Sequence, residues 1–432
     1  MGDFIDGATS CAAGRAETCI DALWPLLCIV IVVQGVVGGA MRYPESKIQN
    51  TEDEVRNKMR VGVNTLFLIP GEVGGSETYV RDVLNHAIPR HPDIEWTLFT
   101  NRENHQVLDK AYGSFPGVSL VALDFNARCR VHRILREQIQ LPVAVARAGI
   151  DVLWSPGYTA PILASCRQVV SILDMQYKAF PEDLSRMAYW ATSVLVPMAA
   201  RRATRVLTLS EFSRSEILKY VRIPEGRVQV VCPAVDSLFS MSSCEPARPS
   251  IVSDGSYVLC VANTYPHKNV HTLLQAMDKV FGRHLVRLVL VGGEGRGEAT
   301  VKAVLAGMTH AERVVRMRGL SRGDLAALYQ HAAAFVFPSL YEGFGLPVLE
   351  AMVAGAPVLT TRSGSIPEVG GECVRYFDGS AEDCERCLGE LLAMTPEERR
   401  GMIDEARQRA SSFRWERTAD EIVACFRKSV DV

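Results

Sequence analysis

Apolar and polar residues form a repeating pattern that begins at Met59. Residues 61–69 form a nearly continuous apolar run, and residues 77–88 then place apolar side chains at the three- and four-residue intervals of a helix face. Similar apolar runs predict further strands at 151–154, 168–173 and 205–209. Strands that alternate with helices predict a parallel sheet covered on both faces.

A second series of the same kind follows residues 241–254, which are rich in serine, proline and charge and are predicted to be a linker. Helices are predicted between its strands, for example at 270–280 and 325–333, and Thr395-Pro396 has the cap and first-turn proline of another helix start. Its strands are predicted at 257–261, 286–291, 313–317, 334–337 and 357–360. We therefore predict an α/β protein of two doubly wound, Rossmann-like domains that face each other across a ligand-binding cleft.

The segment before Met59 is a separate question. Residues 22–41 carry no charge and are long enough to span a bilayer as a helix. The residues before them are mainly acidic, unlike the basic leader of a signal peptide. Two interpretations of the extension 1–58 remain open. It is either a membrane anchor, with Arg42 and Lys47 keeping the next domain on the cytoplasmic side, or a dispensable stretch upstream of a start at Met59.

Composition narrows the function classes. The chain has 432 residues, 48% hydrophobic and 22% charged, as in ordinary globular proteins, and its net charge of -2 argues against nucleic acid as the main partner. The 12 cysteines are scattered, which favours reduced thiols in the cytoplasm. Cys384 and Cys387 form a C-x-x-C without a second pair, and no histidine motif of a metal site is present, so no bound metal or other cofactor is predicted.

The most informative segment for chemistry is 335–351. A buried strand leads into a loop with Gly343 and Gly345, and a helix is predicted to start near Pro347. Free amides at such a helix start suit a phosphate or a sugar hydroxyl. Glu342 and Glu350 bracket the loop. An alternative remains open, in which the glycines only form a turn and Glu350 is a first-turn acid favoured by the helix dipole.

The run Glu342-Gly343-Phe344-Gly345-Leu346-Pro347-x-x-Glu350 resembles the E-x7-E signature of family-4 retaining glycosyltransferases of the GT-B fold. The resemblance extends from Met59 to about Lys428. It implies that Glu350 holds the ribose hydroxyls of a nucleotide, that Glu342 lies near the donor sugar, and that the amides of Phe344, Gly345 and Leu346 meet sugar and phosphate. It further implies an acceptor-side domain at 59–240, completed by a C-terminal helix at 413–432, and a nucleotide-sugar domain at 241–412.

A lysine follows the first strand of the second domain, in the segment 263–269. At a helix start, Lys268 is well placed to neutralise a diphosphate leaving group. In the alternative interpretation, it is an ordinary solvated lysine in a turn, without a binding role. The family resemblance favours the diphosphate and includes Asn263 in the donor site. Many relatives carry an arginine a few residues earlier, where this chain has Ala262 and Asn263, so Lys268 is expected to carry more of the charge.

The first domain supplies weaker signals. The glycine loop containing Gly74 and Gly75 resembles the family's loop near the diphosphate and the acceptor. Asp174 fits the family pattern and is expected to orient the acceptor, although a strand-end aspartate that caps a loop is an open alternative. Trp154 and Leu173 stand in family segments where histidines are often found.

The resemblance implies sugar transfer from a nucleotide-diphosphate sugar to a glycan or lipid-linked acceptor, with retention at the anomeric carbon and without a metal. GDP-mannose is the favoured donor, and the cytoplasm, at the inner face of the plasma membrane if the extension anchors the chain, is the expected location. Two alternatives stay open: a non-catalytic sugar-nucleotide-binding homologue, and a GT-B epimerase or phosphorylase.

Overall fold

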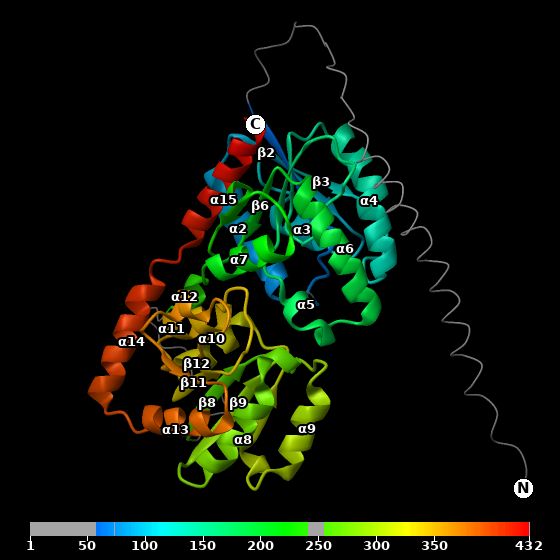
Figure 1. Cartoon of the computed structure of the whole chain (residues 1–432). Helices are drawn as coiled ribbons and strands as arrows, with labels where there is room; N and C mark the ends of the chain where they lie inside the picture. Colours follow the sequence, from blue (N-terminus) through cyan, green and yellow to red (C-terminus); the bar gives the residue numbers. More distant parts are fainter. Residues whose placement is uncertain (1–57, 73, 241–254, 432) are drawn as a thin grey trace, which may run out of the picture.

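The protein consists of two α/β domains, one above the other in Figure 1. The structure is a computed structural model that describes residues 58–72, 74–240 and 255–431. The extension 1–57 and the linker 241–254 therefore lie outside the described residues. No helix among the described residues is long and apolar enough to cross a membrane.

The first domain is built on a seven-stranded parallel sheet with the order β3-β2-β1-β4-β5-β6-β7. Its central strands are largely buried because helices cover both faces, whereas the edge strand β3 has no fully buried residue. The strands are β1 (Met59–Asn64), β2 (Ile94–Thr100), β3 (Val118–Ala122), β4 (Val152–Ser155), β5 (Arg167–Ser171), β6 (Arg205–Thr208) and β7 (Val228–Val230). The helices are α2 (Gly75–Arg90), α3 (His105–Tyr112), α4 (Arg130–Arg147), α5 (Gln176–Ala179), α6 (Arg186–Arg202) and α7 (Glu211–Tyr220).

The second domain has a six-stranded parallel sheet with the order β10-β9-β8-β11-β12-β13. The strands are β8 (Ser256–Val261), β9 (Val286–Val291), β10 (Val314–Met317), β11 (Ala334–Phe337), β12 (Val358–Thr361) and β13 (Arg375–Phe377). The helices are α8 (Val270–Phe281), α9 (Glu298–Gly307), α10 (Arg322–Gln330), α11 (Leu346–Ala354), α12 (Ile366–Gly370), α13 (Ala381–Leu392) and α14 (Pro396–Ala410). The two doubly wound domains predicted from the pattern are confirmed.

The bounds of some elements differ from the prediction. The strand predicted at 61–69 ends at Asn64, because the hydroxyl and amide of Thr65 both turn to the carbonyl oxygen of Phe99 and the chain then folds into a turn. The helix predicted at 325–333 begins earlier, at Arg322, because the hydroxyl of Ser321 accepts a hydrogen bond from the amide of Asp324. Thr395 and Glu398 form the capping box of α14.

The C-terminal helix α15 (Trp415–Val430) packs on the first domain. In Figure 1, α14 and α15 run along one side of the molecule from the second domain to the first. Phe426 places its ring 6.3 Å from that of Trp96 and 5.9 Å from that of Trp154, measured between centroids. Asp420 pairs with Arg90 of α2 at 2.6 Å. The C-terminal helix α15 is therefore part of the core of the first domain.

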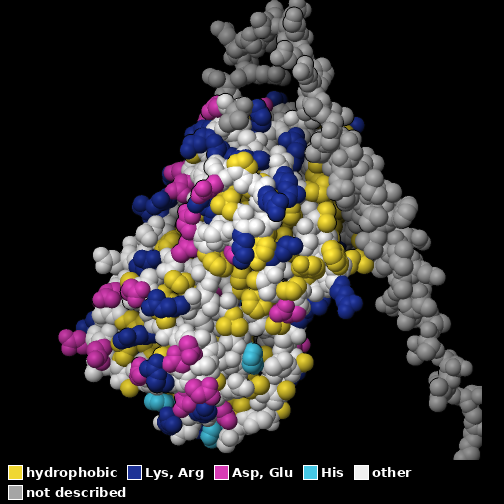
Figure 2. Space-filling model, in the orientation of Figure 1, with side chains coloured by type: hydrophobic (Ala, Val, Ile, Leu, Met, Phe, Trp, Pro, Cys, Tyr) yellow, Lys and Arg dark blue, Asp and Glu magenta, His cyan; other side chains and the backbone are white. Residues whose placement is uncertain are grey.

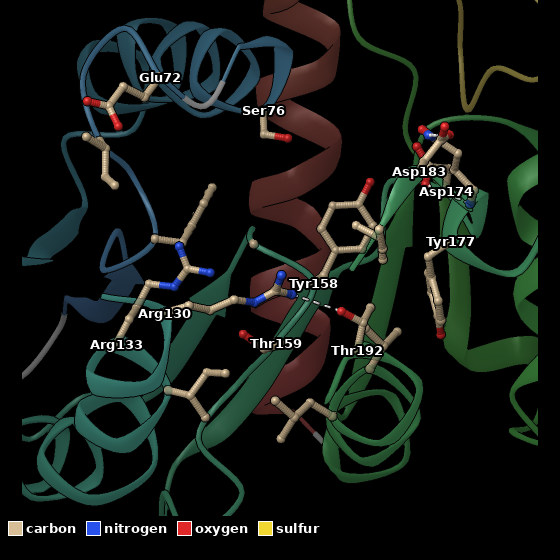
Figure 3. Close-up of a pocket in the computed structure, with 18 of the residues that line it drawn as sticks. Glu72, Ser76, Arg130, Arg133, Tyr158, Thr159, Asp174, Tyr177, Asp183 and Thr192 are labelled. Atoms are coloured by element: carbon tan, nitrogen blue, oxygen red, sulfur yellow. Dashed lines mark hydrogen bonds between the residues drawn. The ribbon is translucent and has the colours of Figure 1, made fainter. Parts of the chain in front are cut away.

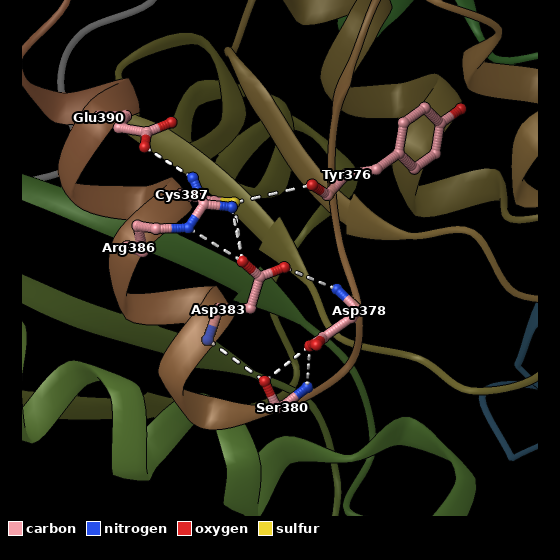
Figure 4. A network of polar contacts seen from close by, with 7 residues as sticks. All are labelled: Tyr376, Asp378, Ser380, Asp383, Arg386, Cys387 and Glu390. Atoms are coloured by element: carbon pink, nitrogen blue, oxygen red, sulfur yellow. Dashed lines mark hydrogen bonds and ion pairs between the residues drawn. The ribbon is translucent and has the colours of Figure 1, made fainter.

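The C-x-x-C pair lies on α13, whose start is fixed by a polar network (Figure 4). Ser380 caps the helix by accepting from the amide of Asp383, and Arg386 pairs with the carboxylate of Asp383 at 2.6 Å. The thiols of Cys384 and Cys387 are buried, and burial raises the pKa of the Cys387 thiol. Among the described residues, no group of three or more His, Cys, Asp or Glu side chains could hold a metal ion.

Candidate active site

The order of the strands creates a crevice in each sheet. In the second domain, β8 and β11 are neighbours although β9 and β10 lie between them in sequence, so the loops that follow β8 and β11 diverge at this switch point. In the first domain, β1 and β4 form the equivalent point. A pocket of about 660 Å³ lies between the domains, and Figure 3 shows the first-domain side chains that line it. Open α/β sheets bind ligands at such crevices.

Lys268 and Glu342 meet at the second-domain switch point. Lys268 ends the short 3-10 helix Pro266–Lys268 before α8, and Glu342 lies in the loop after β11. The ammonium nitrogen of Lys268 is 2.5 Å from Oε1 of Glu342, and the two side chains are only 19% and 12% exposed. Lys268 is therefore a partly buried, ion-paired group at the site, and the solvated-lysine alternative is wrong.

The glycine loop after β11 leaves three amides free. Gly345 is the N-cap of α11 with φ 97°, a left-handed conformation that favours glycine. Within the described part of the chain, the amides of Phe344, Gly345 and Leu346 have no hydrogen-bond acceptor. Amides at a helix N-terminus form an anion-binding site. The loop is therefore compatible with the predicted phosphate or sugar hydroxyl, which stays a prediction.

Glu350 lies deeper in the same helix, where its Oε2 accepts a hydrogen bond from the hydroxyl of Tyr329 at 2.8 Å. Burial raises the pKa of the Glu350 carboxyl to about 7. Glu350 is the fifth residue of α11, beyond the first turn to which helix-dipole effects are confined. The alternative of a first-turn acid is thus wrong, and the remaining oxygen of Glu350 can accept from a ligand hydroxyl.

Asp174 follows β5 at the wall of the pocket. One carboxylate oxygen accepts from the amide of Gln176 at 3.1 Å, so Asp174 does cap its own loop. Burial raises the pKa of the Asp174 carboxyl, whereas hydrogen bonds from the Gln176 amide and the Tyr158 hydroxyl lower it. The charge of Glu342 raises this pKa and the charge of Lys268 lowers it. Asp174 therefore shares one electrostatic environment with the Lys268–Glu342 pair from the other domain.

The domains touch directly at Gly343. A Cβ atom at this position would lie 2.7 Å from the Cβ of Asp174, so only glycine permits the approach. The carbonyl oxygen of Gly343 accepts hydrogen bonds from the hydroxyls of Ser210, at 2.7 Å, and Ser213, at 3.0 Å. Ser210 is also the N-cap of α7, where its hydroxyl accepts from the amide of Ser213.

A second carboxylate joins the domains beside this contact. Glu368 of α12 accepts hydrogen bonds from the amides of Glu211 and Phe212, at 2.8 and 2.7 Å, at the free N-terminus of α7. His267 and Asp183 add an interdomain contact of 2.6 Å. The domains are therefore closed over the pocket.

The remaining predicted residues lie around this centre. Gly74 is the N-cap of α2 and Gly75 its first residue, and the neighbouring Glu72 and Ser76 line the pocket. Asn263 also lines the pocket, and its Oδ1 accepts from the amide of Gly293 at 2.7 Å.

The two positions that lack the family's histidines are both buried. Trp154 donates its indole N–H to the hydroxyl of Ser171 at 2.9 Å, and Leu173 is 6% exposed. Both side chains belong to the core of the protein.

Sequence reasoning missed residues in and beside the pocket. The glycine-rich run 292–297, directly after β9, does not line the pocket but packs against Asn263 and Thr264 next to it, and its glycine content could have indicated a close turn. Arg130, Arg133 and Asp183 line the pocket. Their surroundings offered no signal, because charged residues outside a motif are usually solvated.

Comparison with known proteins agrees with this geometry. The model described as Glycosyltransferase Family 4 matches residues 73–237, and the model described as Glycosyl transferases group 1 matches residues 245–409. The MMP alpha-(1->4)-mannosyltransferase of Mycolicibacterium hassiacum is 33% identical over 236 residues, 54% of this chain and 56% of that protein. The O-antigen chain mannosyltransferase B of Escherichia coli is 32% identical over 233 residues, 52% of this chain and 61% of that protein.

Solved structures share the whole architecture. Sucrose-phosphate synthase from Thermosynechococcus elongatus superposes with a TM-score of 0.70 at 17% identity, covering 86% of this chain and 99% of that one. HepE of Anabaena in complex with UDP and glucose has a TM-score of 0.67 at 17% identity, covering 86% and 100%. The alignments to the two mannosyltransferases, in contrast, span little more than half of those proteins.

Proposed function

Because this chain belongs to the family-4 glycosyltransferases of the GT-B fold, we propose that it transfers a mannose-like sugar from a nucleotide-diphosphate sugar to a glycan or lipid-linked acceptor. The observation that carries the proposal is the meeting of Lys268, Glu342 and three free amides at the second-domain switch point, opposite Asp174 of the first domain.

The second domain holds the donor in this proposal. Glu350 accepts hydrogen bonds from the ribose hydroxyls, and the amides of Phe344, Gly345 and Leu346 meet the diphosphate and the sugar. Lys268 exchanges part of its interaction with Glu342 for the departing diphosphate, and Glu342 remains beside the donor sugar. Fixed donors aimed at developing negative charge are among the strongest contributions that a protein makes to catalysis.

The acceptor hydroxyl enters from the first domain, where Asp174 orients it. We propose retention at the anomeric carbon, with catalysis by positioning and by stabilisation of the leaving group. The closed contact at Gly343 supports this arrangement, because it sets Asp174 beside the donor loop.

Mannose as the sugar is supported by relatives that are named as mannosyltransferases, and GDP as its carrier is taken from the family resemblance. HepE is seen in complex with UDP and glucose, so UDP-glucose is the donor to test against. A thermal-shift screen of both nucleotide-sugars tests the proposal. A true donor at about 100 times its Kd adds roughly 2.7 kcal/mol to the free energy of unfolding.

Turnover separates this proposal from the two alternatives. Isolated protein, labelled donor and a glycan acceptor should give a labelled glycan whose new anomeric centre keeps the donor's configuration. Binding without turnover would indicate a non-catalytic homologue, favoured only by the buried Trp154 and Leu173 in place of histidines. An epimerised nucleotide-sugar or a free sugar phosphate as product would indicate an epimerase or a phosphorylase.

A further inference from the structure

Two arginines extend into the interdomain pocket from the first turn of α4 (Figure 3). Arg130 donates a hydrogen bond to the hydroxyl of Thr192 at 3.0 Å. Among the residues that the structure describes, neither Arg130 nor Arg133 has a carboxylate within 4.0 Å. Burial lowers the pKa of both guanidinium groups, and the charge of Arg133 lowers that of Arg130 further. Two neighbouring cations thus share the wall of one cavity.

The acidic side chains that line the pocket already have hydrogen-bond or ion-pair partners other than the two arginines. Glu72 pairs with Arg128 at 2.5 Å and Asp183 with His267 at 2.6 Å. Glu137 lies one turn after Arg133, and its charge raises the pKa of that guanidinium group. Its carboxylate oxygens nevertheless accept hydrogen bonds from Asn64 and Thr159, not from Arg133, and burial raises the pKa of its own carboxyl. The positive charge of the two arginines is therefore not neutralised by direct contact with any described side chain that lines the pocket.

The position of the arginines on α4 is itself unfavourable without a ligand. The first turn of α4 contains no acidic residue, and its N-cap, Cys129, makes no side-chain hydrogen bond. Cations at this end of a helix oppose the helix dipole, and the partly buried charge of Arg133 also loses hydration. An anion between Arg130 and Arg133 would relieve both costs.

The opposite side of the pocket is also polar, and some of its buried polar atoms lack hydrogen-bond partners among the described residues. Figure 3 shows Asp174 and Asp183 across the pocket from the two arginines. Within the described part of the chain, Oδ1 of Asp183 and the hydroxyl of Tyr177 are buried without a hydrogen-bond partner, and both residues line the pocket. Buried polar atoms without partners are rare, and a ligand with hydroxyl groups would satisfy them.

We propose that the acceptor is a phosphorylated sugar, whose phosphate or diphosphate binds Arg130 and Arg133 while its hydroxyl groups face Asp174 and Asp183. This inference rests on the proposed glycosyl transfer and names the class of its acceptor. Guanidinium groups match phosphate oxygens with paired, charge-assisted hydrogen bonds.

The phosphate belongs either to a soluble sugar phosphate or to a lipid-linked sugar. The helix α6 contributes Thr192 to the pocket and exposes Met187, Trp190 and Val194 beside it. Figure 2 shows hydrophobic side chains gathered on this face of the first domain, with Lys and Arg among them. A soluble sugar phosphate and a lipid-linked sugar would present the same phosphate group to the arginines, so the experiment tests each source separately.

The test uses the full chain saturated with GDP, which occupies the donor diphosphate site. Calorimetric titration compares mannose 1-phosphate and mannose 6-phosphate with unphosphorylated mannose. Sedimentation with phosphatidylcholine vesicles, with and without a polyprenyl-diphosphate sugar, forms the lipid arm. Wild-type protein should prefer at least one phosphorylated probe by about tenfold or more, and Arg130→Gln and Arg133→Gln should each remove most of this preference.

Arg147→Gln is the matched control, because Arg147 is exposed at the other end of the same helix and its change removes the same charge. It should leave the preference intact. Equal binding of phosphorylated and neutral probes in both arms, or a preference that survives both pocket substitutions, would overturn the inference.

The two proposals fail separately. Transfer to a neutral acceptor at wild-type rates in both arginine variants would overturn the acceptor class and leave glycosyl transfer standing. Binding of a phosphorylated probe through the arginines, without any turnover of donor, would contradict the proposed transfer and retain the anion site.

Discussion

The ammonium group of Lys268 lies 2.5 Å from a carboxylate oxygen of Glu342, although the two residues belong to different loops that are 74 positions apart in sequence. Each therefore fixes the other at the switch point of the second sheet. The pair places a positive charge where a diphosphate is proposed to depart, and its two members have separable roles.

Lys268→Ala should lower kcat by about 10²- to 10³-fold, as expected for loss of one donor to the developing charge of the leaving group. Because Glu342 is only 12% exposed, the substitution also leaves a carboxylate without its partner, and the melting temperature should fall modestly. The double variant Lys268→Ala/Glu342→Gln should recover the melting temperature and not the rate. Steady-state kinetics at saturating donor measures the change in kcat, and calorimetry measures the change in Tm. A wild-type kcat in Lys268→Ala would show that the diphosphate binds elsewhere.

The two glutamates should respond differently to the same substitution. Glu350→Gln removes the charge that strengthens hydrogen bonds to ribose, so the affinity for free nucleotide should fall by about 1–3 kcal/mol. Glu342→Gln should leave nucleotide affinity nearly unchanged and reduce transfer. Titration of free nucleotide into both variants decides the matter. Wild-type affinity in both would remove Glu350 from the ribose site.

Nucleotide affinity should depend on pH through Glu350. Its carboxyl has a pKa raised to about 7 by burial, and the ribose hydroxyls bind the ionised form better. Affinity should therefore be highest above pH 7 and fall as pH drops, by up to about tenfold per unit well below the pKa. Titrations from pH 5.5 to 8.5 measure this slope. Glu350→Gln is the control, because it removes the titration of this carboxyl and keeps the titration of the nucleotide's own phosphates. Identical pH profiles of affinity in the wild type and in this variant would contradict the placement of Glu350 at the ribose.

Gly343→Ala should separate donor binding from transfer. The new methyl group would meet Asp174 at 2.7 Å, so the domains could not close as observed. Misplacing reacting groups by about 1 Å costs on the order of 10²-fold in rate, whereas nucleotide affinity should persist on the second domain. Gly389→Ala in α13, where an added Cβ meets nothing within 4 Å, is the control and should be fully active. Small-angle scattering should show a larger radius only for the first variant.

Removal of residues 1–58 tests the role of the extension. If the stretch lies upstream of the true start, the shortened chain should be equally active and the full chain should not associate with membranes. If it is an anchor, membrane association should disappear while activity is kept. Membrane fractionation of both forms in the source cell distinguishes these outcomes.

Most of the fold could be predicted from sequence because its signals are local. Buried parallel strands are apolar runs, and the loops after β8 and β11 carry recognisable residues at their ends. The pairing of Lys268 with Glu342 could not be read in this way, because it depends on which strands become neighbours. The cations at Arg130 and Arg133 were missed for a related reason: only the closed pocket distinguishes them from solvated residues of an ordinary helix.

The return of α15 to the first domain sets the order in which the chain can mature on the ribosome. Domains usually fold as they emerge, the N-terminal one first. Here Phe426 fills the space between Trp96 and Trp154, so the core of the first domain stays open until residues 415–430 have been translated, after the whole second domain. The same connection constrains hybrid enzymes. A donor domain can be exchanged only as an insert between two retained segments, with α15 taken from the parent that supplies the acceptor side.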